Sequence, residues 1–266
     1  MPLPILRPKN PEAPKRPEKP RDRLNALVQG SILHRALAEG QLDRVFEKEC
    51  QKNNILRTYR TEAIRLELQR HFEAFQANTN WPLNWPSQTE QKFEIALTPE
   101  LSIRGRIDRL DIGPANQAIV IDYKYSAAAK IRERIDGDPV QGGLYLLAAE
   151  RYFNLRPAGM FYCGLRQSVT WEGWHASIPG LQLGEARTES GLRELITSAA
   201  KTSIAVHDSI VSGDKEVRPA DRNKCRYCDY NAICRVESIS RITTAIPVGQ
   251  VPDLPSSDVR PERAIS

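Results

Sequence analysis

The 266-residue sequence lacks any apolar run that approaches the roughly 18 residues needed for a membrane-spanning helix. Its first residues do not resemble a signal peptide, because prolines interrupt any apolar segment there. It has no internal repeat and no phosphate loop of the form G-x-x-x-x-G-K-(S/T). We therefore expect no membrane partner, a cytoplasmic location and no helicase motor within this chain.

Cysteine is scarce and charge is nearly balanced. The five cysteines are an odd number in a chain of this length, so a disulfide framework is not expected. The net charge of +5 suits a polyanionic partner, but it suits many ordinary proteins equally well. Hydrophobic residues make up 40% of the chain, which is enough for a sizeable core.

The two ends of the chain differ in composition from the middle. Residues 1–23 carry seven prolines interspersed with Lys and Arg. Because proline fixes φ and removes a backbone donor, we expect a disordered, extended arm, in preference to a basic arm that touches phosphates. Residues 241–266 are rich in Pro and Ser and are expected to be a disordered tail. Residues 24–240 are expected to form one folded domain.

The middle of the chain switches between helical and strand periods. Helical spacing predicts a first helix capped by Asp22, and further helices over residues 56–77, 139–152 and 184–211. Alternation and one apolar run predict strands over residues 93–97, 103–107, 118–124, 158–164 and 169–177. This order predicts an α/β class, in which helices cover a central sheet.

Charged residues end two of the predicted strands. Side chains two apart in a strand share a face, so Asp122 and Lys124 should project together. Asp108 lies on the preceding strand, and two carboxylates on adjacent strands can hold one Mg²⁺ ion. The Lys124 ammonium can then serve the attacking water or a scissile phosphate. An Asp-x-Lys triplet is often only solvated surface, but charges that end a buried run are costly unless they are paired or functional.

These segments together resemble a known nuclease pattern. Gly105-Arg-Ile-Asp108-Arg and Ile121-Asp122-Tyr-Lys124 are similar to the core motifs of the PD-(D/E)XK superfamily, especially its RecB/AddB-like branch. Gly30-Ser-Ile-Leu-His34 is similar to the G-x-x-x-H helix of that branch, and Gln141-Gly-Gly-Leu-Tyr145 to its Q-x-x-x-Y helix. The resemblance implies a restriction-endonuclease-like fold with a mixed central sheet flanked by helices.

The resemblance also implies an activity. It indicates a metal-dependent DNase that uses Mg²⁺ or Mn²⁺, acts as an exonuclease in recombination or DNA repair, and has DNA and a helicase subunit as partners. The alternative from another class is a catalytically idle DNA-binding or scaffolding module that keeps the nuclease fold. Metal-dependent cleavage would separate the two.

Roles for individual residues follow from the resemblance. The implied metal ligands are His34, Asp108, Asp122 and the backbone carbonyl of Tyr123. The implied catalytic residues are Asp108, Asp122, Lys124, Gln141 and Tyr145, of which Lys124 serves the water and the last two position the substrate. Glu94 lies on the strand before that of Asp108. Two interpretations have equal weight: a carboxylate that supports the metal ligands without binding the ion, and an ordinary exposed strand residue.

Three of the cysteines form a C-x2-C-x5-C segment, namely Cys225, Cys228 and Cys234. Sites of four cysteines accept zinc or an iron–sulfur cluster. In the RecB/AddB-like branch this triplet binds a [4Fe-4S] cluster, whose fourth cysteine precedes the G-x-x-x-H helix. Here no cysteine precedes Gly30. The favoured explanation is that the natural protein is longer than this chain. The alternatives are that Cys50 or a non-cysteine group is the fourth ligand, or that the cluster has been lost. Cys163 is expected to be a buried thiol.

Basic residues surround the Asp108 motif. Arg104, Arg106 and Arg109 flank this aspartate and are predicted to bind DNA phosphates. A second basic group follows the Lys124 strand in an expected loop and consists of Lys130, Arg132 and Arg134. Phosphate contact and an ordinary solvated loop are equally weighted interpretations of this group. No base-reading motif is evident, and hydrolysis through phosphate contacts would need none.

Overall fold

The computed structural model describes residues 24–137, 139–214, 216–217, 219, 222–228 and 230–234. The chain forms two compact units, residues 1–208 and residues 209–266. The predicted arm and tail lie outside the described residues. Within the described residues, no helix is long and apolar enough to cross a bilayer.

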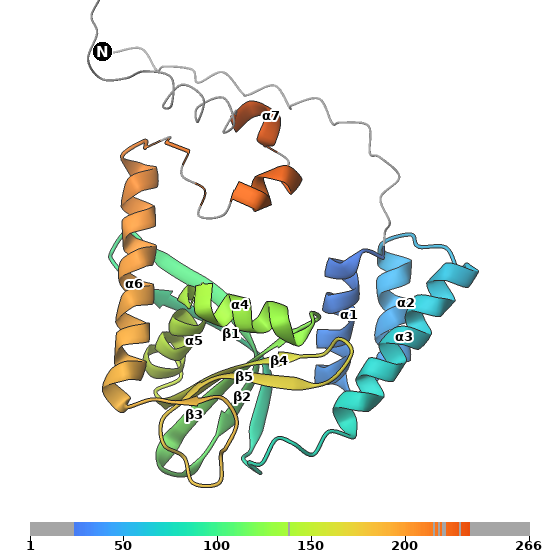
Figure 1. Ribbon diagram of the computed structural model, residues 1–266, viewed down its shortest axis with the longest axis horizontal. Coiled ribbons are helices and arrows are strands. Elements are labelled where there is room, and N and C mark those ends of the chain that lie inside the picture. Colours follow the sequence, from blue (N-terminus) through green and yellow to red (C-terminus); the bar gives the residue numbers. More distant parts are fainter. Residues whose placement is uncertain are drawn as a thin grey trace, which may run out of the picture. The chain divides into compact units, whose positions relative to one another are not determined.

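Three helices begin the first unit and pack against one another (Figure 1): α1 (Ala26–Glu39), α2 (Leu42–Lys52) and α3 (Tyr59–Gln76). The α1 cap is Asn25, whose side chain accepts hydrogen bonds from the backbone N–H groups of Leu27 and Val28. The predicted cap, Asp22, lies outside the described residues. Thr58 caps α3 by accepting from the N–H of Thr61.

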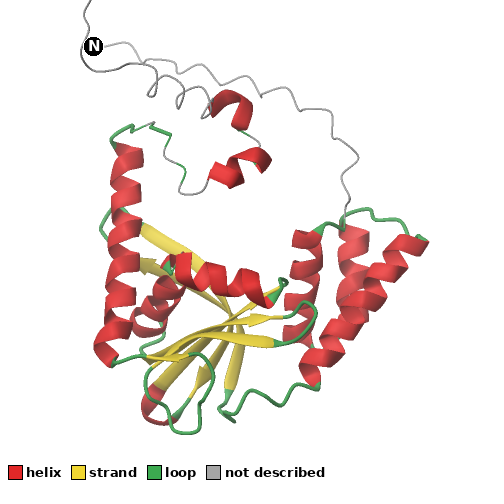
Figure 2. Cartoon of the chain, viewed as in Figure 1, coloured by secondary structure: helices red, strands yellow, loops and turns green. Residues whose placement is uncertain are grey.

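A six-stranded sheet follows, in the order β1-β2-β3-β4-β5-β6. Its strands are β1 (Ser87–Ala96), β2 (Ser102–Ile112), β3 (Gln117–Lys124), β4 (Arg156–Gly164), β5 (Thr170–His175) and β6 (Glu185–Ala186). The pairs β3–β4 and β5–β6 are parallel, and the other three are antiparallel. The sheet is therefore mixed and is flanked by helices (Figure 2), which confirms the predicted fold class.

Helices cover both faces of the sheet. On β3, Ile119 and Ile121 face the core shared with α1–α3. Val120 faces the second core, which is shared with α5 (Val140–Arg151) and α6 (Glu189–Val211). A strand buried on both faces reads as a continuous apolar run, as this one does. Asp122 and Lys124 continue the row of Val120, so they point toward α5.

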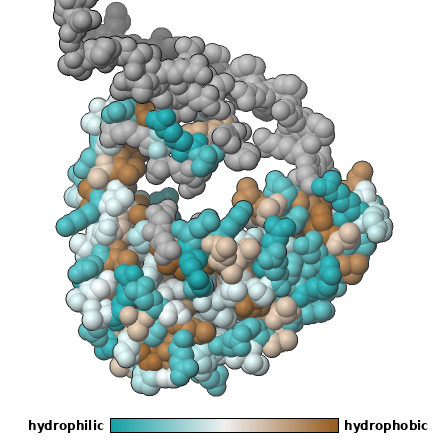
Figure 3. Space-filling view, in the orientation of Figure 1, coloured by the Kyte–Doolittle hydropathy of each residue, from teal (hydrophilic) through white to brown (hydrophobic). Residues whose placement is uncertain are grey.

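The structure corrects the loop expected after β3. That segment is α4 (Ala128–Gly137), and Lys130 and Arg132 lie on it. Arg134 belongs to the same helix, but its side chain lies outside the described part. Ile131 is buried against the second core, and Ile135 packs there four residues later, a helical spacing that the charges obscured. In Figure 3, hydrophilic and hydrophobic residues are interspersed over the face in view.

Candidate active site

Strands β2 and β3 separate where the two predicted carboxylates lie. Their pairing runs from Ile112–Ala118 to Arg109–Ile121 and ends there, one residue before Asp108 and Asp122. Both aspartates are buried. The backbone N–H of Tyr123 donates to Asp108 Oδ2 over 2.9 Å, and this bond holds the separated strand ends together. The sheet therefore places two carboxylates side by side in a protected position.

Helix α1 brings His34 to the same place. Its Nδ1 lies 3.4 Å from Asp108 Oδ2, and its ring meets the Tyr123 ring edge-on with centroids 6.0 Å apart. Gly30 lies one turn earlier, where a Cβ atom would come within 3.4 Å of Tyr125 Cβ. Helix α1 therefore packs directly against the residue that follows β3.

Helix α5 contributes a hydrogen-bonding amide on the other side. Gln141 Nε2 donates to Asp122 Oδ1 (3.2 Å) and to the Tyr145 hydroxyl (3.0 Å). Its Oε1 accepts from Lys124 Nζ over 3.3 Å. Gly143 allows α5 to pack tightly on α6, since a Cβ atom there would lie 2.5 Å from the Leu195 carbonyl oxygen. Gln141 thus links the predicted lysine, one carboxylate and the tyrosine.

The electrostatics of the site follow from burial. Burial raises the pKa of the Asp122 carboxyl; the Lys124 ammonium opposes this shift, and the Asp108 carboxylate adds to it. Burial, with Asp122 nearby, also raises the pKa of Tyr145 to about 12. The Tyr145 hydroxyl is therefore neutral near pH 7, when it can donate a hydrogen bond.

The donor types at the site fit a hard divalent cation. Asp122 Oδ2 is buried and pairs with the Lys124 ammonium, whose Nζ lies 2.5 Å away. An ion held by both carboxylates would compete with this ammonium. In the described part of the chain, no three His, Cys, Asp or Glu side chains are arranged as a complete metal site. The ring of Tyr123 is buried in the core on the α1–α3 face.

Comparison with known proteins identifies the family of this chain. The model of the PD-(D/E)XK nuclease superfamily matches residues 10–235. The chain belongs to this superfamily. A solved structure described as "Crystal structure of SSO0001" is 19% identical over 78% of this chain and 84% of that one, with a TM-score of 0.34. No curated protein matches the sequence.

The three arginines of the nuclease motif lie in different environments. Arg104 and Arg106 are exposed and pair with Glu94 (3.0 Å) and Glu90 (2.7 Å). The Arg109 side chain is only 18% exposed and forms two hydrogen bonds, of 2.6 and 2.7 Å, with the buried carboxylate of Asp111. Arg109 is thus turned toward Asp111 in a half-buried position, and its role as a DNA contact stays a prediction.

The sequence pattern does not single out Glu90. This residue lies nearer to the superfamily motif than Glu94 does. It has a left-handed φ of 56° and interrupts the β1–β2 pairing opposite Asp108. Strained backbone of this kind is frequent at functional sites. Glu94 instead pairs with Arg104 in solvent. The signal for Glu90 is the strand register, which the sequence alone does not provide.

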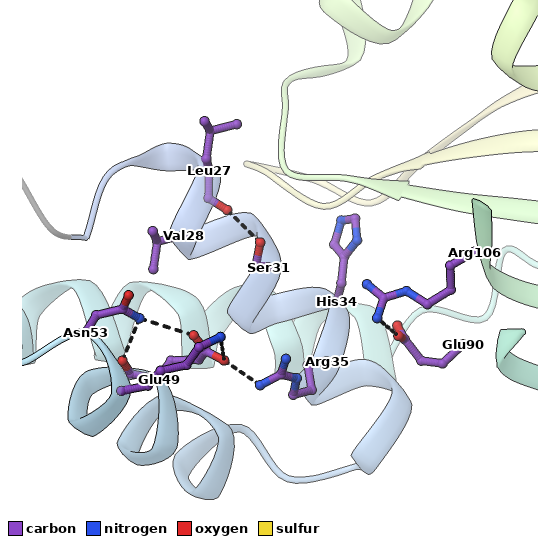
Figure 4. Close-up of a pocket in the computed structure, with 10 residues that line it drawn as sticks. Leu27, Val28, Ser31, His34, Arg35, Glu49, Asn53, Glu90 and Arg106 are labelled. Carbon is purple, nitrogen blue, oxygen red and sulfur yellow. Dashed lines mark hydrogen bonds and ion pairs between the residues drawn. The ribbon is translucent and has the colours of Figure 1, made fainter. Parts of the chain in front are cut away.

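A cavity of about 300 Å³ opens beside His34, between the helices α1 and α2 and the strands β1 and β2 (Figure 4). Glu90 and Arg106 line it from β1 and β2, and Arg35 and Lys52 line it from α1 and α2. The cavity therefore adjoins the candidate active site on the side away from Gln141.

The cysteine triplet lies in the second unit. Cys225 belongs to the short helix η2 (Arg222–Tyr227) and Cys234 ends α7 (Asn231–Cys234), while Cys228 is exposed between them. Cys50 and Cys163 are buried in the core of the first unit, and burial raises the pKa of both thiols.

Proposed function

We propose that the chain is a divalent-metal-dependent DNase. The observation that carries the proposal is the placement of Asp108 and Asp122 at the separated end of β2 and β3, where the buried Asp122 carboxylate faces the Lys124 ammonium. His34 approaches this pair from α1, and Lys124 approaches it along β3. Membership of a superfamily composed largely of nucleases supports the same reading.

The proposed chemistry is phosphodiester hydrolysis. A water oxygen bonds to phosphorus while the bond from phosphorus to one sugar oxygen breaks. His34, Asp108, Asp122 and the Tyr123 carbonyl would hold Mg²⁺ or Mn²⁺, which lowers the pKa of bound water and neutralises phosphate charge. The Lys124 ammonium orients the water or stabilises charge on the phosphate.

Two α5 residues complete the proposed site. Gln141 fixes Lys124 and Asp122 through the hydrogen bonds described above. The Tyr145 hydroxyl, which stays protonated because its pKa is about 12, can donate to a phosphate oxygen. These two residues position the substrate and the lysine and need not exchange protons.

We also propose the finer assignment to a RecB/AddB-like exonuclease of recombination or repair that works in the cytoplasm beside a separate helicase subunit. The support is that Gly30 and His34 on α1, and Gln141 and Tyr145 on α5, approach the same two strands from opposite sides. Digestion of 5′- and 3′-labelled linear strands distinguishes successive removal of nucleotides from internal cuts.

A metal-bound cysteine cluster is a further part of the proposal. Cys225, Cys228 and Cys234 fall within one short segment, which suits three corners of a [4Fe-4S] cluster, with zinc as the alternative. Iron, sulfide and zinc contents of protein purified without oxygen test this. Iron that is lost in Cys228→Ser supports the cluster, zinc supports the alternative, and metal-free folded protein contradicts both.

The main test uses linear single- and double-stranded DNA with Mg²⁺, Mn²⁺ or EDTA. Cleavage that requires the metal supports the DNase. Folded protein that shifts DNA on a gel but leaves it intact in every metal would instead support the idle binding module.

A further inference from the structure

The cavity beside His34 is the right size for one small group. Its volume of about 300 Å³ lies at the lower end of the roughly 300–1,000 Å³ usual for ligand pockets. A cavity of this size suits one nucleotide better than two paired nucleotides. Because His34 lines the cavity (Figure 4), a group bound there would lie beside the proposed metal site.

The charges of the cavity favour an anion. Glu49 is buried, and its carboxylate pairs with the Arg35 guanidinium and accepts one hydrogen bond from the Asn53 amide, which also donates to the Glu49 backbone carbonyl. Glu90 is paired with Arg106, whose guanidinium has donors beyond those that one carboxylate uses. Lys52 is the third cation: its side chain is 70% exposed and its Nζ is 4.0 Å from Glu49 Oε1, a marginal contact. The acids are thus satisfied, and Lys52 is available to a phosphate.

One apolar side chain completes the lining. Leu27 is 82% exposed, although it lies on α1 only two turns before His34. An exposed leucine beside cationic groups suits a ligand that combines an apolar face with negative charge. Leucine contacts the faces of bases in other DNA-binding proteins, where it inserts between base steps.

We propose that this cavity binds the nucleotide next to the scissile phosphate in single-stranded DNA. Lys52 and Arg106 contact its flanking phosphate, and Leu27 packs against its base. The inference rests on the proposed function, because the neighbouring phosphate is the one that the nuclease site would cleave. It deepens that function by assigning a single strand as the form that occupies the site.

The test measures binding separately from cleavage. Fluorescence anisotropy with a labelled oligothymidylate in EDTA gives the Kd over a range of salt concentrations. Lys52→Ala should weaken binding by about three- to tenfold and reduce the slope of log K against log salt by about 0.7, the value for one phosphate contact on a single strand. Lys48→Ala is the matched control, because Lys48 is also exposed on α2 but does not line the cavity.

Leu27 has its own control. Leu27→Ala should weaken binding several-fold and should no longer distinguish oligothymidylate from an abasic strand. Leu56→Ala, which removes a leucine that is 80% exposed beside a different cavity, should behave as wild type. All four replaced side chains are exposed, so unchanged melting temperatures are expected and verify folding.

Several outcomes would overturn the inference. It fails if Lys52→Ala keeps the wild-type Kd and salt slope, if wild type does not bind the strand, or if blunt duplex competes as well as the single strand. Failure of the proposed function looks different. Wild type would then bind with the predicted Lys52 and Leu27 effects yet cleave nothing in Mg²⁺ or Mn²⁺.

Discussion

The imidazole Nδ1 of His34 lies 3.4 Å from Asp108 Oδ2. The same carboxylate oxygen accepts the backbone N–H of Tyr123, so Asp108 connects α1, β2 and β3 at a single atom. The proposed metal site depends on this junction, because it places an imidazole beside two carboxylates from separate elements.

His34→Ala should weaken Mn²⁺ binding by about tenfold or more, since even groups that only support a metal ligand have effects of this size. Isothermal titration calorimetry measures the affinity. His207→Ala, at a histidine on α6 paired with Asp208, is the control and should titrate like wild type. Unchanged Mn²⁺ affinity in His34→Ala would remove this histidine from the proposed site.

Asp122→Asn should stabilise the metal-free protein while abolishing cleavage. Because burial raises the pKa of this carboxyl in the folded state, folding disfavours its charged form near pH 7. An uncharged amide removes that cost, and a gain of about 1 kcal/mol would raise the Tm in EDTA by roughly 2–4 °C.

The pH dependence of this difference has a definite sign. Below the raised pKa, the wild-type side chain is itself protonated when folded, so the two melting temperatures should converge in acid. Exposed Glu194→Gln on α6 should show no gain at any pH. A lower Tm for Asp122→Asn at pH 7 would show that the Lys124 pairing outweighs the burial cost.

Gln141→Ala should lower kcat by about tenfold or more with little change in KM. Its amide positions Lys124 and Asp122, so its removal affects the transition state more than substrate binding. Steady-state kinetics on a single-stranded oligonucleotide separate the two constants. Gln69→Ala, on the exposed side of α3, is the control. A rise in KM alone would instead place Gln141 in substrate binding.

Arg109→Ala should lower the stability of the fold, whereas Arg106→Ala should weaken DNA binding. The first leaves the buried Asp111 carboxylate without its guanidinium, a loss that typically costs 3–5 kcal/mol, on the order of half the stability of a small domain. The second removes an exposed group and should weaken DNA binding without changing the free energy of unfolding. Urea unfolding and anisotropy measure the two effects. A stable Arg109→Ala protein with weak DNA binding would show that Arg109 contacts DNA and that its pairing with Asp111 contributes little to stability.

Much of the fold could be predicted because local patterns and tertiary structure agree. The apolar run before Asp122 predicts a central strand, and β3 is buried on both faces. Pro139 predicts the start of α5 within one residue, which places Gln141 and Tyr145 one turn apart on one helix face. The convergence of these residues with Asp122 then follows from the parallel connection between β3 and β4.

Other features depend on pairing that the sequence does not reveal. Strict alternation fails in β2, where Ile107 and Leu110 enter the same core although they are three residues apart. The left-handed Glu90 lies opposite this irregularity, so neither its place near Asp108 nor the burial of Arg109 follows from a period of two. The helix α2 was missed because its many charges conceal the apolar face formed by Val45, Phe46 and its neighbours.

The most direct test of the proposed nuclease site is the rate at which wild type, Lys124→Met and the control Lys201→Met cleave linear single-stranded DNA in Mn²⁺. The three proteins should have the same Tm, which verifies that all are folded. We predict that wild type and Lys201→Met cleave at the same rate, that EDTA stops both, and that Lys124→Met is slower by at least about 100-fold. Cleavage by Lys124→Met at the wild-type rate would contradict the assignment of the site to these residues.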